Sequence, residues 1–571
     1  MWSAVFATLA TPTAPARPNI LALAFDDLRP WFLPFQDSSI AAPSFLRLAK
    51  GALAFNRTYV QQAVCSPSRN SFMSGRRPDS TRVYNFKTSF RESGVDASGK
   101  PGSEWVALPQ AFKQAGYLTV GMGKLYHPGH PNNNDCSHPE AAGGCPSWTT
   151  TFNTTAPANV TLENHGEHPV LTCIGADCQF RYVNPDAQIF FKENRTLVNG
   201  TTVEAQPACA ALADDKSTDE WLADAAVTTL RAVAGASAPF FFGVGFHKPH
   251  PFWQLPQRYQ DAYADLPLPR AEARTAPKDA PDVAFYSCDA INSRTDVGGP
   301  YCDDASANPI GGGACRYVVP EDPMPDALMK YIRAGYAGGV TWTDSQVGRV
   351  LDELSALGLD DSTVTVMWAD HGWALGELGM YCKMANYELQ TRVPLMIRVP
   401  WLPQTMGTST AALAELVDLY PTLADLAGVD VSSEALEGRS LVPLLRGEAW
   451  DRAAAYSQYP RCVNTSMARE PPYLGTRDPC NQVPADEFTH MGHSIRTAEW
   501  RYTEWPRWTG AAPDWTRIDG VELYDHRDDD GGAFDTHELE NVAADPLHAA
   551  LVKRLSALLR AGPQTARARV S

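Results

Sequence analysis

The stretch VCSPSRNSFMSGRRP, residues 64–78, places a cysteine just before a predicted short helix that begins at Pro67. Pro67 suits the first turn of such a helix, and Gly75 ends it. Cys65 would then lie beside the amino terminus of the helix, where free N–H groups and the helix dipole favour negative charge. Arg69 follows one turn later and would lie close to the same spot. We interpret the stretch as an anion pocket that contains a reactive atom, with half of a disulfide as the alternative role of Cys65.

Four short, β-rich apolar runs each end in side chains that bind metals or anions. The runs are NILALAFDDLRP, YLTVGMGKLYHPG, APFFFGVGFHKPH and STVTVMWADHGWALGE. The polar residues at their ends are Asp26, Asp27, Lys124, His127, His247, Lys248, His250, Asp370 and His371. In a wound α/β sheet, ligands bind beyond the carboxyl ends of the strands. Any one polar end could simply begin a loop, but four of them at the same edge predict a functional site.

The same runs predict the fold. They are nearly continuous in apolar residues, which is typical of strands covered on both faces of a mostly parallel sheet. Helical patterns such as WVALPQAFKQAG and TDSQVGRVLDELSALG alternate with them, as in the α/β class. After about residue 448 the sequence pattern changes to that of shorter antiparallel strands followed by a closing amphipathic helix. We therefore predict a large mostly parallel sheet flanked by helices, followed by a smaller antiparallel α+β unit.

The Cys-x-Pro-x-Arg pattern at Cys65 resembles the signature of the sulfatase family. Further stretches resemble motifs of the same family, and most of all its iduronate-2-sulfatase branch, from about residue 18 to 530: AFDDLRP, PSFLRLAKGALAFNRTYVQQAVCSPSR, GYLTVGMGKLYHPG, HKPH, ADHGWALGELGMYCK, AYSQYPR and MGHSIRTAEWRYT. The resemblance implies an alkaline-phosphatase-like fold and hydrolysis of a sulfuric ester on a sulfated sugar or polysaccharide. It also implies that a formylglycine-generating enzyme converts Cys65 to formylglycine, whose hydrate supplies the nucleophilic oxygen.

The resemblance also implies a metal site. Asp26, Asp27, Asp370 and the formylglycine oxygen at position 65 are the positions that it offers to a divalent cation, with His371 beside them. Oxygen-rich ligation suits calcium or magnesium. Within the family the ion is calcium, so Ca²⁺ is the cofactor that we predict.

The remaining site residues follow from the same resemblance. Arg69, Lys124 and His127 match positions around the hydrate. We assign the two cations to charge stabilisation, and His127 to proton transfer when the aldehyde re-forms. His250 and Lys383 match positions on the leaving-group side of the sulfate. In the implied cycle one hydroxyl of the hydrate attacks sulfur, the alcohol departs, and the second hydroxyl then expels sulfate.

The HKPH motif leaves two histidines open for the leaving-group role. His247 is the alternative to His250, and we rank it lower because a histidine near a strand end is more often structural. One departure concerns Leu378, which stands where a histidine is expected in the iduronate-2-sulfatase branch. The resemblance therefore carries over the chemistry, and the substrate stays open between an iduronate 2-sulfate and a sulfated polysaccharide of another kind.

The domain limits that we predict come from composition. Residues 1–17 resemble a short or incomplete signal segment without a basic n-region. Residues 18–448 form the predicted catalytic domain, and residues 449–571 the smaller C-terminal domain. Gly/Pro/Asn-rich, cysteine-containing stretches at roughly 130–215 and 270–320 look like insertions on the catalytic domain.

Charge, cysteines and glycosylation sequons indicate the compartment. The chain of 571 residues has a formal net charge of −17, which argues against nonspecific binding to nucleic acid. Its 12 cysteines lack paired CxxC spacing, so disulfides are favoured over zinc. Asn-x-Ser/Thr sequons occur at Asn56, Asn153, Asn159, Asn194, Asn199 and Asn464. Beyond the amino terminus, the sequence contains no apolar run of roughly 20 residues that could span a membrane. A secretory-pathway protein, lysosomal or extracellular, is the prediction.

Two other classes of function remain open at this point. The chain could be a phosphoester or phosphonate hydrolase of the same superfamily, because Asp and His metal sites on this fold also handle phosphate. It could also be an inactive carbohydrate-binding homologue, in which an unconverted cysteine leaves a pocket that only binds.

Overall fold

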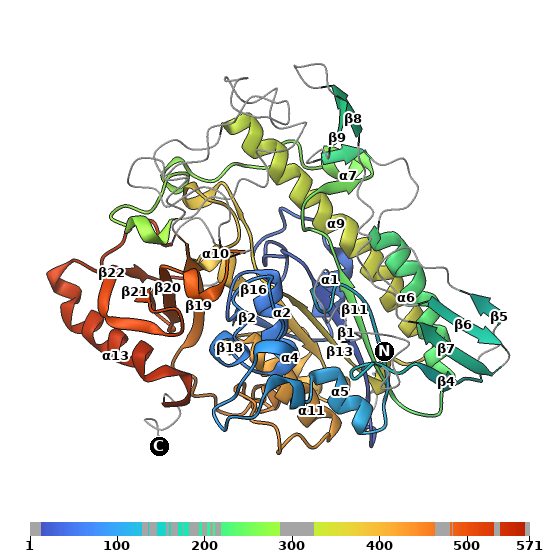
Figure 1. Cartoon of the computed structure of the whole chain (residues 1–571). Coiled ribbons are helices and arrows are strands. Elements are labelled where there is room, and N and C mark those ends of the chain that lie inside the picture. The colour runs from blue at the N-terminus through green and yellow to red at the C-terminus, as the bar shows by residue number, and fades with distance from the viewer. Residues whose placement is uncertain are drawn as a thin grey trace, which may run out of the picture.

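The computed structural model describes residues 13–127, 135, 145–155, 159–161, 170–174, 176–181, 193–196, 202–205, 209–211, 218–285, 325–462, 480–481, 483–529 and 537–565. Its centre is an eight-stranded sheet in the order β16-β2-β17-β13-β1-β11-β3, with β18 paired to β2 (Figure 1). The four predicted strands are adjacent and mutually parallel: β3 (Leu118–Gly123), β11 (Phe240–Phe246), β1 (Asn19–Phe25) and β13 (Thr363–Ala369).

The other half of the sheet is mixed. Its strands are β17 (Leu395–Arg398), β2 (Leu53–Tyr59), β16 (Arg392–Val393) and β18 (Thr408–Glu415). Strand β17 runs antiparallel to both β13 and β2, and β16 runs antiparallel to β2. The predicted mostly parallel sheet is thus confirmed, with antiparallel pairs on one side.

Helices cover both faces of the sheet, as the buried strands require. Trp368 of β13 lies beside Ala24 of β1 and shares its face, while Phe25 lies on the opposite face. Phe72 of α2 (Cys65–Ser74) packs against Trp368, and Phe45 of α1 (Pro43–Ala49) packs against Phe25. The α1 layer also contains α6 (Thr218–Ala234) and α9 (Asp326–Ala356); the α2 layer also contains α5 (Leu108–Gln114) and α11 (Leu419–Ala427).

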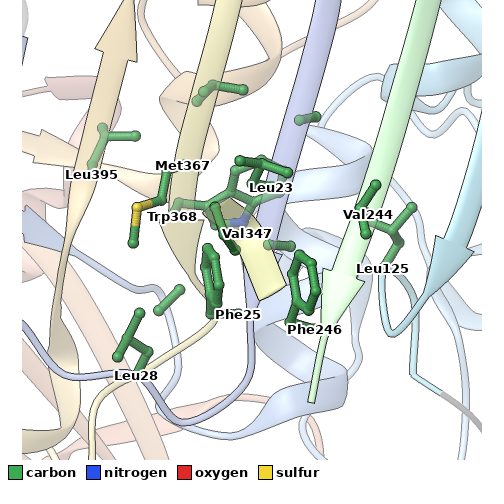
Figure 2. Close-up of a cluster of buried hydrophobic side chains, with 14 of the residues drawn as sticks. Leu23, Phe25, Leu28, Leu125, Val244, Phe246, Val347, Met367, Trp368 and Leu395 are labelled. Atoms are coloured by element: carbon green, nitrogen blue, oxygen red, sulfur yellow. The ribbon is translucent and has the colours of Figure 1, made fainter. Parts of the chain in front are cut away.

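The core lies between the sheet and these helices. Figure 2 shows Phe25 and Phe246, from the neighbouring strands β1 and β11, close together in this core. Their rings stack with centroids 5.6 Å apart. Val347 of α9 is completely buried there as well. Because aromatic and β-branched side chains fill this space, the ends of the central strands are held by close packing.

A second sheet follows in the C-terminal region. It is antiparallel, in the order β19 (Ala455–Arg461), β20 (His490–Arg496), β21 (Trp500–Trp508) and β22 (Pro513–Asp525), and helix α13 (Ala549–Thr565) packs against it (Figure 1). The predicted antiparallel strands and closing helix are therefore confirmed. The limits 18–448 and 449–571 stay a prediction.

The predicted cysteine-rich insertions are partly within the described residues. The first carries a four-stranded sheet made of β4 (Thr151–Asn153), β7 (Asp177–Arg181), β6 (Val170–Ile174) and β5 (Asn159–Thr161). It also carries a hairpin made of β8 (Glu193–Thr196) and β9 (Thr202–Ala205), followed by β10 (Cys209–Ala211), which pairs with β12 (Trp253–Leu255). Most of the second insertion lies outside the described residues.

The prediction of disulfides is confirmed for two pairs, Cys173–Cys178 and Cys462–Cys480. Among the described residues Cys65 is the free cysteine, so its alternative role as half of a disulfide is wrong. None of the described helices is long and apolar enough to cross a membrane.

Candidate active site

The polar residues at the ends of the four parallel strands meet at one edge of the sheet. Asp26 and Asp27 follow β1, and Asp370 and His371 follow β13. Lys124 follows β3 on the other side of β11. Because parallel strands end at the same edge, residues more than 300 positions apart become neighbours, and the predicted convergence is confirmed.

Cys65 is the first residue of α2, two positions before the predicted start at Pro67. Val64 precedes it in an extended conformation and provides no side-chain cap. The helix ends at Gly75, whose φ of 68° lies in the left-handed region that glycine tolerates. The thiol therefore lies at the amino terminus of a ten-residue helix, where the helix dipole favours negative charge.

The Sγ atom of Cys65 is surrounded by four side chains from four separate segments of the chain. Lys383 Nζ lies 2.9 Å from Sγ, His371 Nε2 3.3 Å, and Asp26 Oδ1 3.4 Å. Lys124 Nζ lies 3.8 Å away. The cysteine, which is 1% exposed, is thus held between two cations, a carboxylate and an imidazole.

Three carboxylates define the floor of the site, and all are fully buried. The backbone N–H of Asp27 donates to Asp370 Oδ1 at 3.1 Å. Lys383 Nζ donates to Asp27 Oδ1 at 2.8 Å, and Lys124 Nζ donates to Asp26. Asp27 has a φ of 61°, an uncommon conformation for a residue other than glycine, which turns this peptide sharply beyond β1.

Arg69 links the carboxylates to helix α2. Its Nε donates to Asp370 Oδ2 at 2.9 Å, and its Nη2 lies 3.7 Å from Asp26 Oδ1. Its Nη1 donates to the backbone carbonyl of Lys124. Nη2 is buried and has no hydrogen-bond partner in the described structure. The predicted position of Arg69, one turn along the helix from Cys65, is confirmed.

Burial and crowding move the pKa values in this cluster. Burial, helped by the neighbouring charge of Asp26, raises the pKa of Asp27 to about 8. Burial would also raise the pKa of Asp26, but the ammonium of Lys124 and the other nearby cations hold it well below its usual range. Burial, with the charge of Asp26, raises the pKa of the Cys65 thiol to about 11. The unmodified thiol is therefore protonated at neutral pH and is a poor nucleophile.

The oxygen atoms present fit a hard divalent cation. Asp26, Asp370, Cys65 and His371 each place one ligand atom within 4.8 Å of the others, and Asp26, Asp27, Cys65 and His250 form an overlapping group. Asp27 Oδ2 is buried without a hydrogen-bond partner in the described structure. Ca²⁺ and Mg²⁺ prefer oxygen ligands of this kind. The three carboxylates, one of which has an oxygen without a partner, could therefore hold either ion.

The two histidines of the HKPH motif are separated by the geometry. His250 Nε2 lies 4.0 Å from Asp26 Oδ2 and 3.9 Å from Asp27 Oδ2, so His250 faces the carboxylates. The backbone of His247 is held instead by Asp219, on the side of α6. The arrangement favours His250 over His247 as the site histidine. Burial lowers the pKa of His250 well below its usual value.

His127 is half-buried and lies four residues beyond the end of β3. Its ring centroid lies 4.6 Å from that of Phe86. With Asn70 and Tyr126 it lines a small cavity beside the nucleophile helix. Its place around the hydrate stays a prediction.

Trp373, which no motif in the sequence indicated, closes the site between two of the predicted residues. Lys383 Nζ lies 5.3 Å from the centre of its ring, and the ring of His250 lies 6.5 Å from it. The residue is 2% exposed. In the sequence, only its position two residues after His371 indicated that Trp373 lies near the site. Leu378, where a histidine was expected, is fully buried in an apolar cluster with Tyr387.

A buried cysteine at a helix start faces three carboxylates at the carboxyl edge of an α/β sheet, and this arrangement suits metal-assisted hydrolysis. The sulfatase family model matches residues 18–429. The chain belongs to the sulfatase family and is a sulfuric ester hydrolase.

The curated relatives include iduronate 2-sulfatases. The chain is 32% identical over 532 residues to iduronate 2-sulfatase of Mus musculus, which covers 85% of this chain and 84% of the relative. It is also 32% identical over 555 residues to iduronate 2-sulfatase of Homo sapiens, with 89% and 88% covered. The predicted resemblance to the iduronate-2-sulfatase branch is confirmed.

Solved structures share the fold. A phosphonate monoester hydrolase of Agrobacterium radiobacter has a TM-score of 0.63 at 21% identity and covers 97% of this chain and 96% of its own. A protein solved with its substrate D-glucosamine-2-N,6-O-disulfate has a TM-score of 0.59 at 19% identity, with 97% and 99% covered. At these sequence identities the similarity shows that the overall fold is shared, and nothing more.

Proposed function

We propose that this sulfatase removes sulfate from a sulfated sugar at the end of, or within, an acidic polysaccharide, with an iduronate 2-sulfate as the first substrate to test. The observation that carries the proposal is the environment of Cys65 Sγ, with Lys383 at 2.9 Å and His371 at 3.3 Å. The similarity to iduronate 2-sulfatases over most of the chain supports the substrate class.

Position 65 is the proposed nucleophile in its converted form. As a hydrated formylglycine it would offer two hydroxyls on one carbon, one to attack sulfur and one to release sulfate. The raised pKa of the unmodified thiol, about 11, supports conversion because burial works against an active thiolate here. A formylglycine-generating enzyme is the partner that this proposal requires during synthesis.

Asp26, Asp27 and Asp370 are the residues proposed to hold Ca²⁺, together with position 65 and His371. When bound, the ion would polarise the sulfate and favour ionisation of the nucleophile. The three acids are also positioned without it, since Asp27 N–H donates to Asp370 and two lysines donate to Asp26 and Asp27.

The cations carry the remaining proposed roles. Arg69 and Lys124 would stabilise negative charge at position 65, because both lie against Asp26 and the nucleophile helix. Lys383 and His250 would assist the departing sugar oxygen. The lowered pKa of His250 leaves it neutral at neutral pH, so it would act through a hydrogen bond until a negative sulfate ester raises that pKa. His127 is proposed to move the proton that frees sulfate.

A secretory route, lysosomal or extracellular, is part of the proposal. The disulfide Cys173–Cys178 supports an oxidising compartment. Asn153 is exposed and is a suitable glycosylation acceptor, whereas Asn56 lies half-buried within β2 and is a poor one. The domain limits 18–448 and 449–571 are likewise proposed.

The test compares matched esters on the natively expressed enzyme. Sulfate release from an iduronate 2-sulfate disaccharide and aryl alcohol release from an aryl sulfate are measured beside release of the same aryl alcohol from the corresponding aryl phosphate and from the corresponding aryl phosphonate monoester. The proposal expects a kcat/KM at least 100-fold higher for the sulfate ester. A preference for phosphate or phosphonate would overturn it. The mass of the peptide containing residue 65 is measured on the same sample, and an unmodified thiol there would support the carbohydrate-binding alternative.

A further inference from the structure

The loop that carries His250 is held at its start by a buried carboxylate from another element. Strand β11 ends at Phe246, and the chain then turns through His247 and Lys248. Asp219, in the first turn of α6, accepts the backbone N–H of His247 at 2.8 Å and that of Lys248 at 2.8 Å. Each N–H bonds to a different oxygen of the same carboxylate. This two-point contact fixes both the position and the orientation of the peptide.

The remaining contacts of the loop carry that orientation to the imidazole. The backbone N–H of His250 donates to the carbonyl of His247 at 2.9 Å, which closes a tight turn. Lys248 Nζ donates to the carbonyl of His250 at 3.0 Å. His250 Nδ1 is hydrogen-bonded to the carbonyl of Pro251, which leaves Nε2 facing Asp26 and Asp27.

Within the described part of the chain, each oxygen of the Asp219 carboxylate is hydrogen-bonded to the loop. Asp219 is 1% exposed, and a buried charge is costly unless hydrogen bonds compensate it. A neutral cap such as serine could satisfy one N–H of the helix start, but only a carboxylate presents two oxygens to two consecutive loop amides. The arrangement therefore points to the loop, which is the element that lies against the site.

We propose that Asp219 is a positioning residue, which fixes the His247–His250 turn so that His250 Nε2 faces the leaving-group side of the bound sulfate ester. The inference rests on the proposed function for the role of His250, but the position of the loop does not. Nothing in the residue types around Asp219 marks it in the sequence.

The test is Asp219→Asn, with Asp224→Asn as the matched control. Asp224 lies on the same helix, but its side chain is 56% exposed and pairs with Arg349 at the surface. The amide in Asp219→Asn keeps the shape, yet its NH₂ group would face one of the loop N–H groups. We expect kcat on a sugar sulfate to fall by about 10- to 100-fold, since small misplacements of a reacting group cost that much. KM should change little.

The leaving group separates positioning from a general loss of structure. An aryl sulfate releases an aryl oxide that needs little help, so its kcat should fall at least 5-fold less than that of the sugar sulfate. In the His250→Ala background, Asp219→Asn should lower kcat by less than about 3-fold, because the group that it positions is already absent. Equal losses on both esters, or a full additional loss in the double variant, would overturn the inference.

A measurement that needs no activity keeps the inference separate from the proposed function. Amide hydrogen exchange in the peptide covering residues 245–252 should become faster in Asp219→Asn and stay unchanged in Asp224→Asn. Unchanged exchange in Asp219→Asn overturns the inference even if the wild type proves inactive on every sulfate. If Asp219→Asn does not fold, Asp219→Glu, which keeps both oxygens one methylene further out, takes its place with the same ester ratio and the same exchange readout.

Discussion

Two buried clusters of the molecule contain similar residue types and yet differ in kind. The first is the active site around Cys65. The second, here called the ionic network, joins Glu388 of α10 (Glu388–Thr391) to His526 and Glu538, and it also includes Arg496, Arg501 and Asp529. Both contain acids and a histidine close enough to hold a metal ion. The difference between them lies in how their acids are paired.

In the ionic network each carboxylate oxygen of the two glutamates has a donor. Glu388 Oε1 accepts from Tyr59 at 2.8 Å, and Oε2 accepts from Arg501 at 2.5 Å. Glu538 Oε1 accepts from Arg501 at 2.5 Å, and its Oε2 accepts from the backbone N–H of Glu388 at 2.8 Å. In the active site, by contrast, Asp27 Oδ2 and Arg69 Nη2 are buried without a hydrogen-bond partner in the described structure.

The pKa values respond in opposite directions. Burial raises the pKa of Asp27 to about 8. Burial acts on Glu388 in the same sense, but Arg496 and Arg501 overcome it and hold the pKa of Glu388 well below its usual value. Unpaired groups at the end of a sheet therefore mark a place left for ligands, whereas fully paired groups tie segments of the chain together.

The largest effect that we expect is the loss of activity in Cys65→Ala. Removing the proposed nucleophile should lower kcat by about 10⁴-fold or more, as the loss of a covalent nucleophile does elsewhere. The thermal unfolding midpoint should move by only a few degrees, because the site is not where the fold is held. Steady-state kinetics and a thermal melt on the same preparation measure both.

Contamination by a host sulfatase is the main confounder of that result. The control is a preparation from cells that lack formylglycine-generating activity, which should be as inactive as Cys65→Ala. Residual activity of more than a few per cent in protein from those cells would show that a converted position 65 is not the nucleophile.

The ionic network predicts the reverse pattern, a loss of stability without a loss of chemistry. Glu388→Gln leaves Arg496 and Arg501 buried with one fewer negative charge, which should lower the free energy of unfolding by about 3–5 kcal/mol. The kcat of the folded protein should stay within a factor of two. Urea unfolding followed by fluorescence measures the first quantity.

The matched control for this variant is Asp352→Asn. Asp352 pairs with Arg47 at 2.5 Å, but the two side chains are 66% and 52% exposed. An exposed pair of this kind contributes about 0–1 kcal/mol. If both variants cost the same, the ionic network does not hold the region together in the way its pairing indicates.

Metal removal should affect one cluster and leave the other unchanged. At a calcium concentration 100-fold above its Kd, the ion should stabilise the fold by about 2.7 kcal/mol, and a chelator should remove that stabilisation. Asp27→Asn should abolish most of the calcium response, and Glu388→Gln should retain it. Thermal melts with calcium and with EDTA measure the difference for each variant.

The raised pKa of Asp27 gives the calcium response a pH dependence. Below about pH 8 the metal-free carboxyl holds a proton, which calcium must displace, so calcium affinity should rise as the pH increases towards 8. Calorimetry in two buffers of different ionisation enthalpy would detect the released proton. A calcium affinity that is independent of pH from 5 to 8 contradicts this account.

The contrast also explains how much could be predicted from the sequence. The four strand ends were predictable because metal- and anion-binding side chains follow apolar runs directly, as Asp26 and Asp370 do. Helix α9 was predicted only in its second half. Gly338 and Gly339 lower the helix propensity of its middle, but the structure needs them there, since a Cβ on Gly338 would lie 2.8 Å from the backbone of Tyr259.

The ionic network could not be predicted at all. Glu388 and Glu538 are 150 residues apart and neither lies in a strand, so no local pattern in the sequence indicates that they meet. Asp219 was equally hidden, because an acid in the first turn of a helix is ordinary. Residues that act through another residue's backbone leave no signal in their own neighbourhood.

The smallest effect that we expect is a change in the free energy of unfolding at acid pH. Asp529 accepts from His526 and Arg496, and although burial acts to raise it, these donors lower its pKa to about 2. A carboxyl with a lowered folded-state pKa contributes stability above its unfolded pKa of about 4, and this is lost as the pH falls through about 2. Asp529→Asn should therefore lower the free energy of unfolding by about 2 kcal/mol at pH 7 and by little at pH 2.

Urea unfolding across this pH range measures the loss, with Asp352→Asn as the exposed reference. The same loss at both pH values would mean that Asp529 acts through packing, and the division between a paired structural cluster and an unpaired catalytic one would then rest on Glu388 and Glu538 alone.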